Sequence, residues 1–548
     1  MTCPASSSSL SPLVQEVCAD RIFLISFLGR QSMKKNTLRI IACAVAGIGS
    51  LVAQRTLTAA TYLWDVTKAS SLQWNVNNNW GGSGFPSAAG DIANVNGTFT
   101  APATPPYRIY TSSGTPTVGI LNWGSTGNTT TVQIGGYSGG GTVTFDNSGS
   151  GAQINHTTTG TAASDTFASN IVLNDNLTLT AGTTNGAFRI TGSITETGGA
   201  RSVTKSGTGY VTIQNSGAGG AGFGNNWTGG TFLTGGRLMV SGWDDGGTPN
   251  THYSAIPGNI TISGNGRLQN TGPEAIADTA NISFTGSGVW NLGDPATSYE
   301  TIGSLTSAAG ISSDIYSGSV TLAAANGTTS YAGTFGSNNS VALSKTGGST
   351  QTLAGTAANV FTGGLLMTPA VSVTGGILQL NKTAGTDALS GPIALGGTGR
   401  IRLLASNQIN DASTFTFNGG TLDTNGFSET LSTLANSGAS TIDMGAGASI
   451  LTFANSSGQT WSGSIQILNW SGLTAGGGTD QLLFGAGGLS TGQLAMVSFV
   501  NPTNYAPGTY GATILPSGEV VAAVPEPAVL GTLAASGLLA LRRRRVRA

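Results

Sequence analysis

The motifs VTKSG at Val203–Gly207 and TGGRL at Thr234–Leu238 recur later in the chain as LSKTG at Leu343–Gly347 and TGGIL at Thr374–Leu378. The step from the lysine to the second glycine of the TGG motif has the same length in both copies, from Lys205 to Gly236 and from Lys345 to Gly376. Self-similar blocks at a fixed internal spacing are typical of repeat proteins, in which each unit stacks on the next. The constant spacing therefore predicts stacked coils whose strands keep register.

The composition supports an ordered chain of strands. The 548 residues include 85 glycines, only 8% are charged and 39% are hydrophobic. An average soluble domain has roughly 25% charged residues and about 7% glycine, and disordered chains combine high charge with low hydrophobicity. Short runs such as LTLT at Leu177–Thr180 and NITIS at Asn259–Ser263 alternate apolar and polar residues, as a strand with one buried face does. The sequence therefore predicts an all-β fold with almost no helix.

The repeated motifs resemble the autotransporter-associated β-strand repeat, in which a Lys-Thr/Ser-Gly corner, an aromatic-Thr-Gly-Gly turn and a Gly-Gly-x-Leu strand follow one another. The turn reads WTGG at Trp227–Gly230 and FTGG at Phe361–Gly364, and FNGGTL at Phe417–Leu422 is a further echo. The resemblance implies a right-handed parallel β-solenoid (β-helix). Glycine corners and β-branched walls agree with coils of about 20–25 residues. The rival architecture is two or three β-sandwiches in series, which use the same local signals.

Residues 1–60 have the pattern of a secretory signal, with a signal helix. A basic segment at Met33–Arg39 precedes an apolar segment at Ile40–Ala53, and small residues before Thr61 place the cleavage after Ala60. Residues 1–32 fit no part of this pattern, so Met33 is an alternative start. All three cysteines precede the predicted cut; they are Cys3, Cys18 and Cys43. We therefore expect no disulfide and no thiol nucleophile in the exported body.

The segment 524–548 resembles the PEP-CTERM sorting signal of Gram-negative bacteria. The motif Val524-Pro525-Glu526-Pro527 comes first, the weakly apolar segment Ala528–Leu541 follows, and a basic cluster of Arg542, Arg543, Arg544, Arg545 and Arg547 ends the chain. Fourteen helical residues span about 21 Å, less than the roughly 30 Å of a hydrocarbon core, so we expect a short transmembrane helix that inserts transiently into the inner membrane. The resemblance implies that exosortase recognises the Pro-Glu-Pro motif and removes the tail. A simple tail anchor is the alternative.

Between these two segments the sequence predicts three regions. Residues 61–100 form an N-terminal cap, residues 101–481 form the solenoid, and residues 482–523 form a C-terminal closing segment with hairpin-type turns. Three tryptophans lie within the predicted cap; they are Trp64, Trp74 and Trp80. We interpret them as a cover for the first coil. The functional alternative is a platform on which sugar rings stack.

The body offers few residues for catalysis or metal binding. Its two histidines, His156 and His252, have no histidine or cysteine at ligand spacing, and the sequence lacks HExxH and CxxC motifs. The G-x-G-x-x-G match at Gly217–Gly222 lacks the strand-then-helix setting of a dinucleotide site. The adjacent acidic pair Asp244-Asp245 lies in a glycine-rich loop and fits an exposed turn better than a catalytic pair or a calcium loop. We predict no catalytic residue, no metal site and no cofactor.

The charge balance and the end segments together predict the function. Residues 61–524 contain 11 basic and 20 acidic side chains, a net charge of −9, so we exclude nucleic acid as a partner. We predict an exported structural or adhesive protein of the cell surface or extracellular matrix, and not an enzyme. The expected partners are an exosortase-type sorting enzyme and an extracellular polysaccharide. The alternative is a polysaccharide lyase or hydrolase on the same scaffold.

Overall fold

The computed structural model describes most of the chain between its two predicted targeting segments. The described residues are 59–523, without 70–71, 83, 100–105, 113, 127–129, 137–140, 158–164, 183–186, 215–223, 245–251, 295–296, 338 and 364–367. The predicted signal helix and the predicted transmembrane helix at 524–548 lie outside these residues. Within them, no helix combines the length and the apolar character that a membrane crossing requires.

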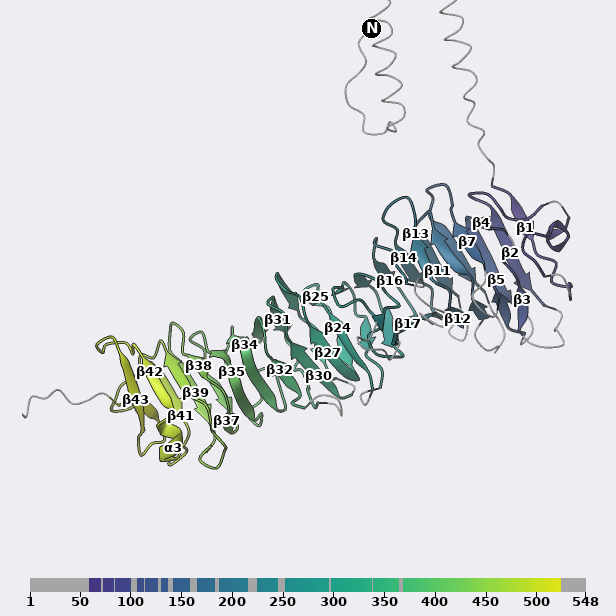
Figure 1. Ribbon diagram of the computed structural model, residues 1–548. Helices are drawn as coiled ribbons and strands as arrows, with labels where there is room; N and C mark the ends of the chain where they lie inside the picture. The colour runs from purple at the N-terminus through teal and green to yellow at the C-terminus, as the bar shows by residue number, and fades with distance from the viewer. Residues whose placement is uncertain are drawn as a thin grey trace, which may run out of the picture. The chain divides into compact units, whose positions relative to one another are not determined.

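Three parallel sheets form the walls of the coils in the N-terminal part (Figure 1). The strands of wall 1 are β1 (Thr61–Leu63), β2 (Ile92–Gly97), β5 (Ile120–Ser125), β8 (Ala152–His156), β11 (Leu177–Ala181), β14 (Val203–Ser206), β16 (Thr231–Leu233), β20 (Ile260–Ile262), β22 (Asn281–Phe284) and β25 (Ser304–Ser307). The strands of wall 2 are β3 (Tyr107–Ile109), β6 (Val132–Ile134), β9 (Asp165–Phe167), β12 (Ala187–Ile190), β15 (Tyr210–Gln214), β17 (Arg237–Ser241), β21 (Arg267–Asn270), β23 (Val289–Asn291), β26 (Asp314–Tyr316) and β29 (Thr334–Phe335). Wall 3 contains β4 (Thr117–Val118), β7 (Thr142–Phe145), β10 (Asn170–Leu173) and β13 (Ile194–Glu196).

A fifteen-stranded sheet continues the coils toward the C-terminus. Its strands are β24 (Tyr299–Ile302), β27 (Gly318–Leu322), β28 (Thr328–Tyr331), β30 (Val341–Lys345), β31 (Thr350–Gly355), β32 (Val371–Val373), β33 (Ile377–Lys382), β34 (Ile393–Leu403), β35 (Phe415–Asp423), β37 (Leu434–Asn436), β38 (Ser440–Asp443), β40 (Ile465–Leu468), β42 (Val497–Val500), β43 (Thr509–Ile514) and β44 (Val520–Ala522). The first half of β34 pairs with β32 and the second half pairs with β33, so this one sheet covers two walls. A three-stranded sheet of β36 (Glu429–Leu431), β39 (Ser449–Phe453) and β41 (Asp480–Leu483) lies beside it in the coil order.

The length of the coils varies along the chain. Phe415 pairs with Leu434 across one short coil, whereas Ile120 pairs with Gln153 across a much longer one. These two coils fall on either side of the predicted length, because the loops between strands differ in length while the strands stay paired. The variable loops explain why most of the chain shows no strict period. The two sequence repeats keep their spacing because their coils are equally long: Lys205 pairs with Leu233, and Lys345 pairs with Val373.

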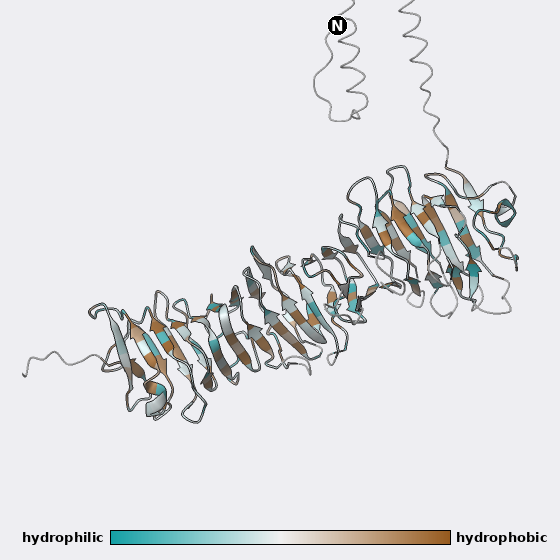
Figure 2. Cartoon of the chain, in the orientation of Figure 1, coloured by the Kyte–Doolittle hydropathy of each residue, from teal (hydrophilic) through white to brown (hydrophobic). Residues whose placement is uncertain are grey.

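The interior is built from alternate residues of each strand. In β8, Ala152 and Ile154 point inward and are fully buried, while Gln153 and Asn155 between them are only partly buried. Ile154 lies beside Leu179 of the next coil, which is also fully buried. Burying one such side chain stabilises the fold by roughly 1.5–3 kcal/mol, and stacking makes this apolar column continuous. Figure 2 shows the resulting alternation of apolar and polar residues along the strands.

The described residues contain little helix and few antiparallel pairs. Their helical elements are the single turns η1 (Asn77–Trp80) and α3 (Thr491–Leu494). Antiparallel strands pair at β18 (Trp243–Asp244) with β19 (His252–Tyr253), and at β42 with β43 and β43 with β44. The hairpin of β43 and β44 covers the free edge of β42, which limits edge-to-edge association. The predicted parallel β-solenoid is thus confirmed, and the alternative of β-sandwiches in series is wrong because the walls are parallel.

Candidate functional surface

Most residues predicted for sorting lie outside the described residues. These are Val524, Pro525, Glu526 and Pro527 and the arginines from Arg542 to Arg545. Ala60, the residue before the predicted signal cut, is described. Its amide donates to Asp91 Oδ1 at 3.1 Å, and its carbonyl accepts from the Ile92 amide at 2.8 Å. The backbone at the predicted cleavage site is therefore hydrogen-bonded to the next coil.

The three tryptophans near the N-terminus form a buried cluster. Trp64 and Trp74 each pack edge-on against Trp80, with ring centroids 5.0 and 4.8 Å apart. The Trp64 indole donates to the Tyr107 hydroxyl at 3.1 Å, and the Trp80 indole donates to the Trp74 carbonyl at 2.6 Å. At most 2% of each tryptophan is exposed, so none offers a ring face to a sugar. The interpretation as a cover for the first coil fits this packing, and the sugar-stacking alternative does not.

His156 is part of a buried pair rather than an accessible catalytic group. Its Nε2 lies 2.8 Å from Asp165 Oδ2, and both side chains are almost fully buried. The imidazole packs against the rings of Trp123 and Phe188, each with its centroid 5.2 Å away. The side chain of His252 is not described. Among the described residues, no group of three or more His, Cys, Asp or Glu side chains could hold a metal ion.

Buried carboxyl groups cap the backbone of a neighbouring coil. Glu300 accepts from the amides of Ala275 at 2.9 Å and Ile276 at 3.1 Å. Glu429 accepts from the amides of Gln408 at 2.7 Å and Ile409 at 3.2 Å. Burial raises the pKa of Glu429 to about 8, and burial together with the charge of Glu274 raises the pKa of Glu300 well above its usual value.

These two glutamates do not form a glycosidase-type pair. Each is only 1% exposed, so a polysaccharide cannot reach either carboxyl group. Their capping bonds satisfy buried backbone amides of residues that lie outside the named strands. Of the acidic pair Asp244-Asp245, Asp245 and the Asp244 side chain lie outside the described part of the chain.

The repeat lysines have the same structural role in both copies of the motif. Lys205 is buried at the end of β14, and its ammonium group donates to the carbonyls of Ser206, Gly207 and Gly235 at 2.7–3.1 Å. The carbonyl of Gly235 belongs to the next coil, so the lysine joins two successive corners.

The second copy repeats two of these three contacts, those with the carbonyls that correspond to Gly207 and Gly235. Lys345, at the end of β30, donates to the carbonyl of Gly347 and to that of Gly375 at 3.4 Å. Gly376, which follows, has a φ of +62°, and a Cβ there would lie 2.3 Å from the Gly347 carbonyl oxygen. Only glycine fits this position, because a side chain would suffer both the strained φ and the overlap. The Lys-x-Gly and Gly-Gly motifs are therefore two halves of one corner.

The outer face of wall 1 carries rows of hydrogen-bonded polar side chains. Asn122 Nδ2 donates to Asn94 Oδ1 at 2.8 Å, and Asn155 Nδ2 donates to Asn122 Oδ1 at 3.0 Å, one bond per coil. Farther along the same row, the hydroxyls of Thr180 and Ser206 lie 3.0 Å apart. These side chains are partly exposed and uncharged. The rows stabilise the stack and present regularly spaced amide and hydroxyl groups to solvent.

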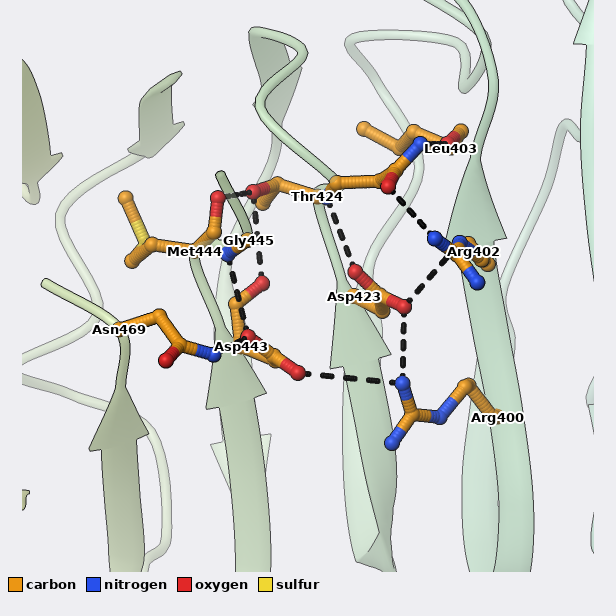
Figure 3. A network of polar contacts seen from close by, with 10 residues as sticks. Arg400, Arg402, Leu403, Asp423, Thr424, Asp443, Met444, Gly445 and Asn469 are labelled. Carbon is orange, nitrogen blue, oxygen red and sulfur yellow. Dashed lines mark hydrogen bonds and ion pairs between the residues drawn. The ribbon is translucent and has the colours of Figure 1, made fainter. Parts of the chain in front are cut away.

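A charged network lies on the outer side of β34, β35, β38 and the end of β40 (Figure 3). Asp423 Oδ2 lies 2.8 Å from Arg400 Nη1 and 3.3 Å from Arg402 Nε. Asp443 Oδ2 lies 3.8 Å from Arg400 Nη1, and its other oxygen accepts from Asn469 Nδ2 at 2.6 Å. Two arginines thus face two aspartates, so the network is electrically balanced.

This network was missed in the sequence, although a signal for it exists. Arg402, Asp423 and Asp443 follow one another at intervals of one coil each, and Arg400 lies two residues before Arg402 on the same strand. Opposite charges at the coil spacing would indicate contacts across strands once the register is known.

Comparisons of the chain with protein-family models, with curated proteins and with solved structures found no match.

Proposed function

We propose that this protein is exported and sorted through its C-terminal segment to the cell surface or extracellular matrix, where it acts as a structural or adhesive β-solenoid. The observation that carries the proposal is that the polar side chains described above form hydrogen bonds and ion pairs within the fold. The buried acids and lysines hydrogen-bond the backbone, and the outer asparagines and the charged network bond one another. Such a molecule is suited to being a scaffold.

The sorting part of the proposal rests on the sequence. The motif Val524–Pro527, the apolar segment and the arginine cluster follow the order of the PEP-CTERM signal. The right-handed winding rests on the resemblance of the repeats. A polysaccharide partner is supported by the rows of uncharged amides and hydroxyls, which match the hydrogen-bonding groups of sugars.

Mass spectrometry of both termini tests the sorting step. The full-length chain is expressed in a Gram-negative host that has an exosortase and in the same host without it. We expect an N-terminus near Thr61 in both, and loss of Arg542–Arg547 only where exosortase is present. Replacing Pro525 and Pro527 by alanine should block removal of the tail, whereas Pro516→Ala, upstream of the motif, should not. A cell-associated product that retains Arg547 in the exosortase host contradicts the proposal.

The scaffold role is tested separately on the secreted protein. Incubation with a panel of neutral and acidic polysaccharides should release neither reducing ends nor unsaturated products. Release of either product would favour the alternative function, a polysaccharide hydrolase or lyase.

A further inference from the structure

Two arginines lie side by side on the outer face of wall 2 and form no ion pair with the acidic side chains that the structure describes. Tyr210, Arg237 and Arg267 pair in register across β15, β17 and β21, so their side chains project from one face of the sheet. Neighbouring strands are about 4.8 Å apart, and like charges directly opposite one another destabilise a sheet. Among the side chains that the structure describes, no acidic group forms an ion pair with either arginine.

The guanidinium group of Arg267 has an unused donor. Its Nε is buried and has no hydrogen-bond partner within the described part of the chain. The ring of Tyr316 lies 5.8 Å from the guanidinium carbon, which helps to hold the group in place. A buried donor without an acceptor costs about 1–3 kcal/mol. Because Nε is enclosed by the protein, an anion would reach this arginine at its terminal guanidinium nitrogens.

A cavity lies at the two arginines. It has a volume of about 270 Å³ and is lined by Thr208, Tyr210, Gly236, Arg237 and Arg267. A Cβ at Gly236 would lie 2.9 Å from the ammonium nitrogen of Lys205, so a third cationic group lies directly behind this glycine. Lys205 does not line the cavity, because its ammonium group is buried and donates to backbone carbonyls, so it acts on the cavity only through its nearby positive charge.

We propose that this cavity, the arginine pocket, binds the carboxylate group of an acidic sugar in an extracellular polysaccharide. Two guanidinium groups offer the paired donors that a planar carboxylate accepts. The Tyr210 ring at the rim provides a flat surface for the sugar ring, and Thr208 provides a hydroxyl. The polymer as the source of the carboxylate rests on the proposed extracellular role, whereas recognition of the anion rests on the pocket alone.

Calorimetric titration of the purified full-length protein at low salt tests the pocket. The probes are tetragalacturonate, its methyl ester and monomeric galacturonate. We expect the tetramer to bind, the neutral ester to bind at least about tenfold more weakly, and the monomer to bind more weakly than the tetramer. Equal binding of the ester overturns recognition of the anion. A monomer that binds as tightly as the tetramer overturns the polymer as the source.

Variants locate the binding site. Arg237→Gln and Arg267→Gln should each weaken tetragalacturonate binding at least about tenfold, since a charge-assisted hydrogen bond is lost. Arg108→Gln removes the same charge from β3 of the same wall and should leave the affinity unchanged. Unchanged affinity in both pocket variants overturns the proposal. Circular dichroism confirms the fold of each variant, and Arg267→Lys, which keeps the charge but not the paired donors, should bind with intermediate affinity. Binding to purified protein does not depend on sorting, so the two proposals fail independently.

Discussion

The two copies of the repeat build the same corner and carry different outer surfaces. Inside, Lys205 and Lys345 donate to equivalent carbonyls, and a glycine at +62° follows in each copy. Outside, Arg237 of the first copy corresponds to Ile377 of the second. The two copies thus share the lysine and glycine contacts of the corner, whereas their outer residues differ.

The difference extends to the next coil. Arg237 pairs in register with Arg267, and Ile377 pairs in register with Arg400. Arg400 is neutralised by Asp423, whereas Arg267 has no acidic partner among the described side chains. One arginine is thus bound within the fold and the other is available to a ligand. The same repeat supplies a structural ion pair in one copy and an anion pocket in the other.

The largest effect on stability should come from breaking the balanced network. Asp423→Ala removes the acceptor shared by Arg400 and Arg402 and should lower the free energy of unfolding by about 2 kcal/mol. The shift of the denaturant midpoint measures it. Asp278→Ala, which removes an exposed acid elsewhere, should cost less than about 0.5 kcal/mol. Equal midpoints for the two variants would show that the network contributes nothing.

Arg237→Ile gives the first copy the outer residue of the second. Binding of tetragalacturonate should weaken at least about tenfold, while stability should rise by about 0.2–1 kcal/mol because the repulsion from Arg267 is removed. The reciprocal Ile377→Arg should create no affinity for the anion, since Arg400 is already paired with Asp423. Titration and thermal melts of both variants measure these effects. If Arg237→Ile still bound tetragalacturonate with unchanged affinity, the proposed difference between the two copies would be wrong.

The shared corner should respond to pH in both copies. Burial lowers the pKa of Lys205 and of Lys345 to about 8, below the ordinary value of 10.5. Between these values the unfolded lysine holds a proton that the folded lysine has released, so stability should rise as the pH rises from the folded pKa to the unfolded pKa. The slope is below about 1.4 kcal/mol per pH unit for each lysine.

Denaturant midpoints at pH 7, 8, 9 and 10 measure this slope. Lys205→Met and Lys345→Met should each flatten it to the same extent, because the two corners are alike. Below pH 8, where both states are protonated, each variant should run parallel to the wild type. A pH slope that neither substitution changes would mean that the buried lysines do not titrate in this range.

Salt should act in opposite directions on the two surfaces, with the smallest effect. Screening at 0.5 M NaCl weakens the attraction between Arg400 and Asp423 and also the repulsion between Arg237 and Arg267. Each change should be below about 0.5 kcal/mol, because the arginine side chains are partly exposed. The stabilising effect of Arg237→Ile should therefore shrink in salt, as should the cost of Asp423→Ala. An Arg237→Ile advantage that grows with salt would rule out repulsion as its cause.

The sequence predicts the scaffold better than it predicts the surfaces. Alternation in runs such as Leu177–Thr180 and the corner motifs at Lys205 and Lys345 are local, so they identify a parallel solenoid without contact information. The network and the pocket depend on which residues become neighbours across coils. Coil lengths differ widely between pairs such as Phe415 with Leu434 and Ile120 with Gln153, so this register is not readable from sequence spacing.

The burial of some acidic side chains could not be predicted from the sequence either. Glu300 and Glu429 look like ordinary surface acids in the sequence, yet both are enclosed where they cap amides of another coil. Their partners lie one coil away along the chain. The sorting segment differs in kind: its pattern is complete within one short stretch, and it stays a prediction because 524–548 lies outside the described residues.

The lysine corners also bear on how the chain would yield to mechanical tension. In a stack held by nearest-neighbour contacts, pulling on one terminus should detach the coils one after another. At Lys205 the detaching coil must also break the hydrogen bond between the ammonium group and the Gly235 carbonyl of the next coil. We expect the force needed to detach a coil to be highest at Lys205 and again at Lys345. Each lysine corner would therefore slow the unfolding of the coils that follow it.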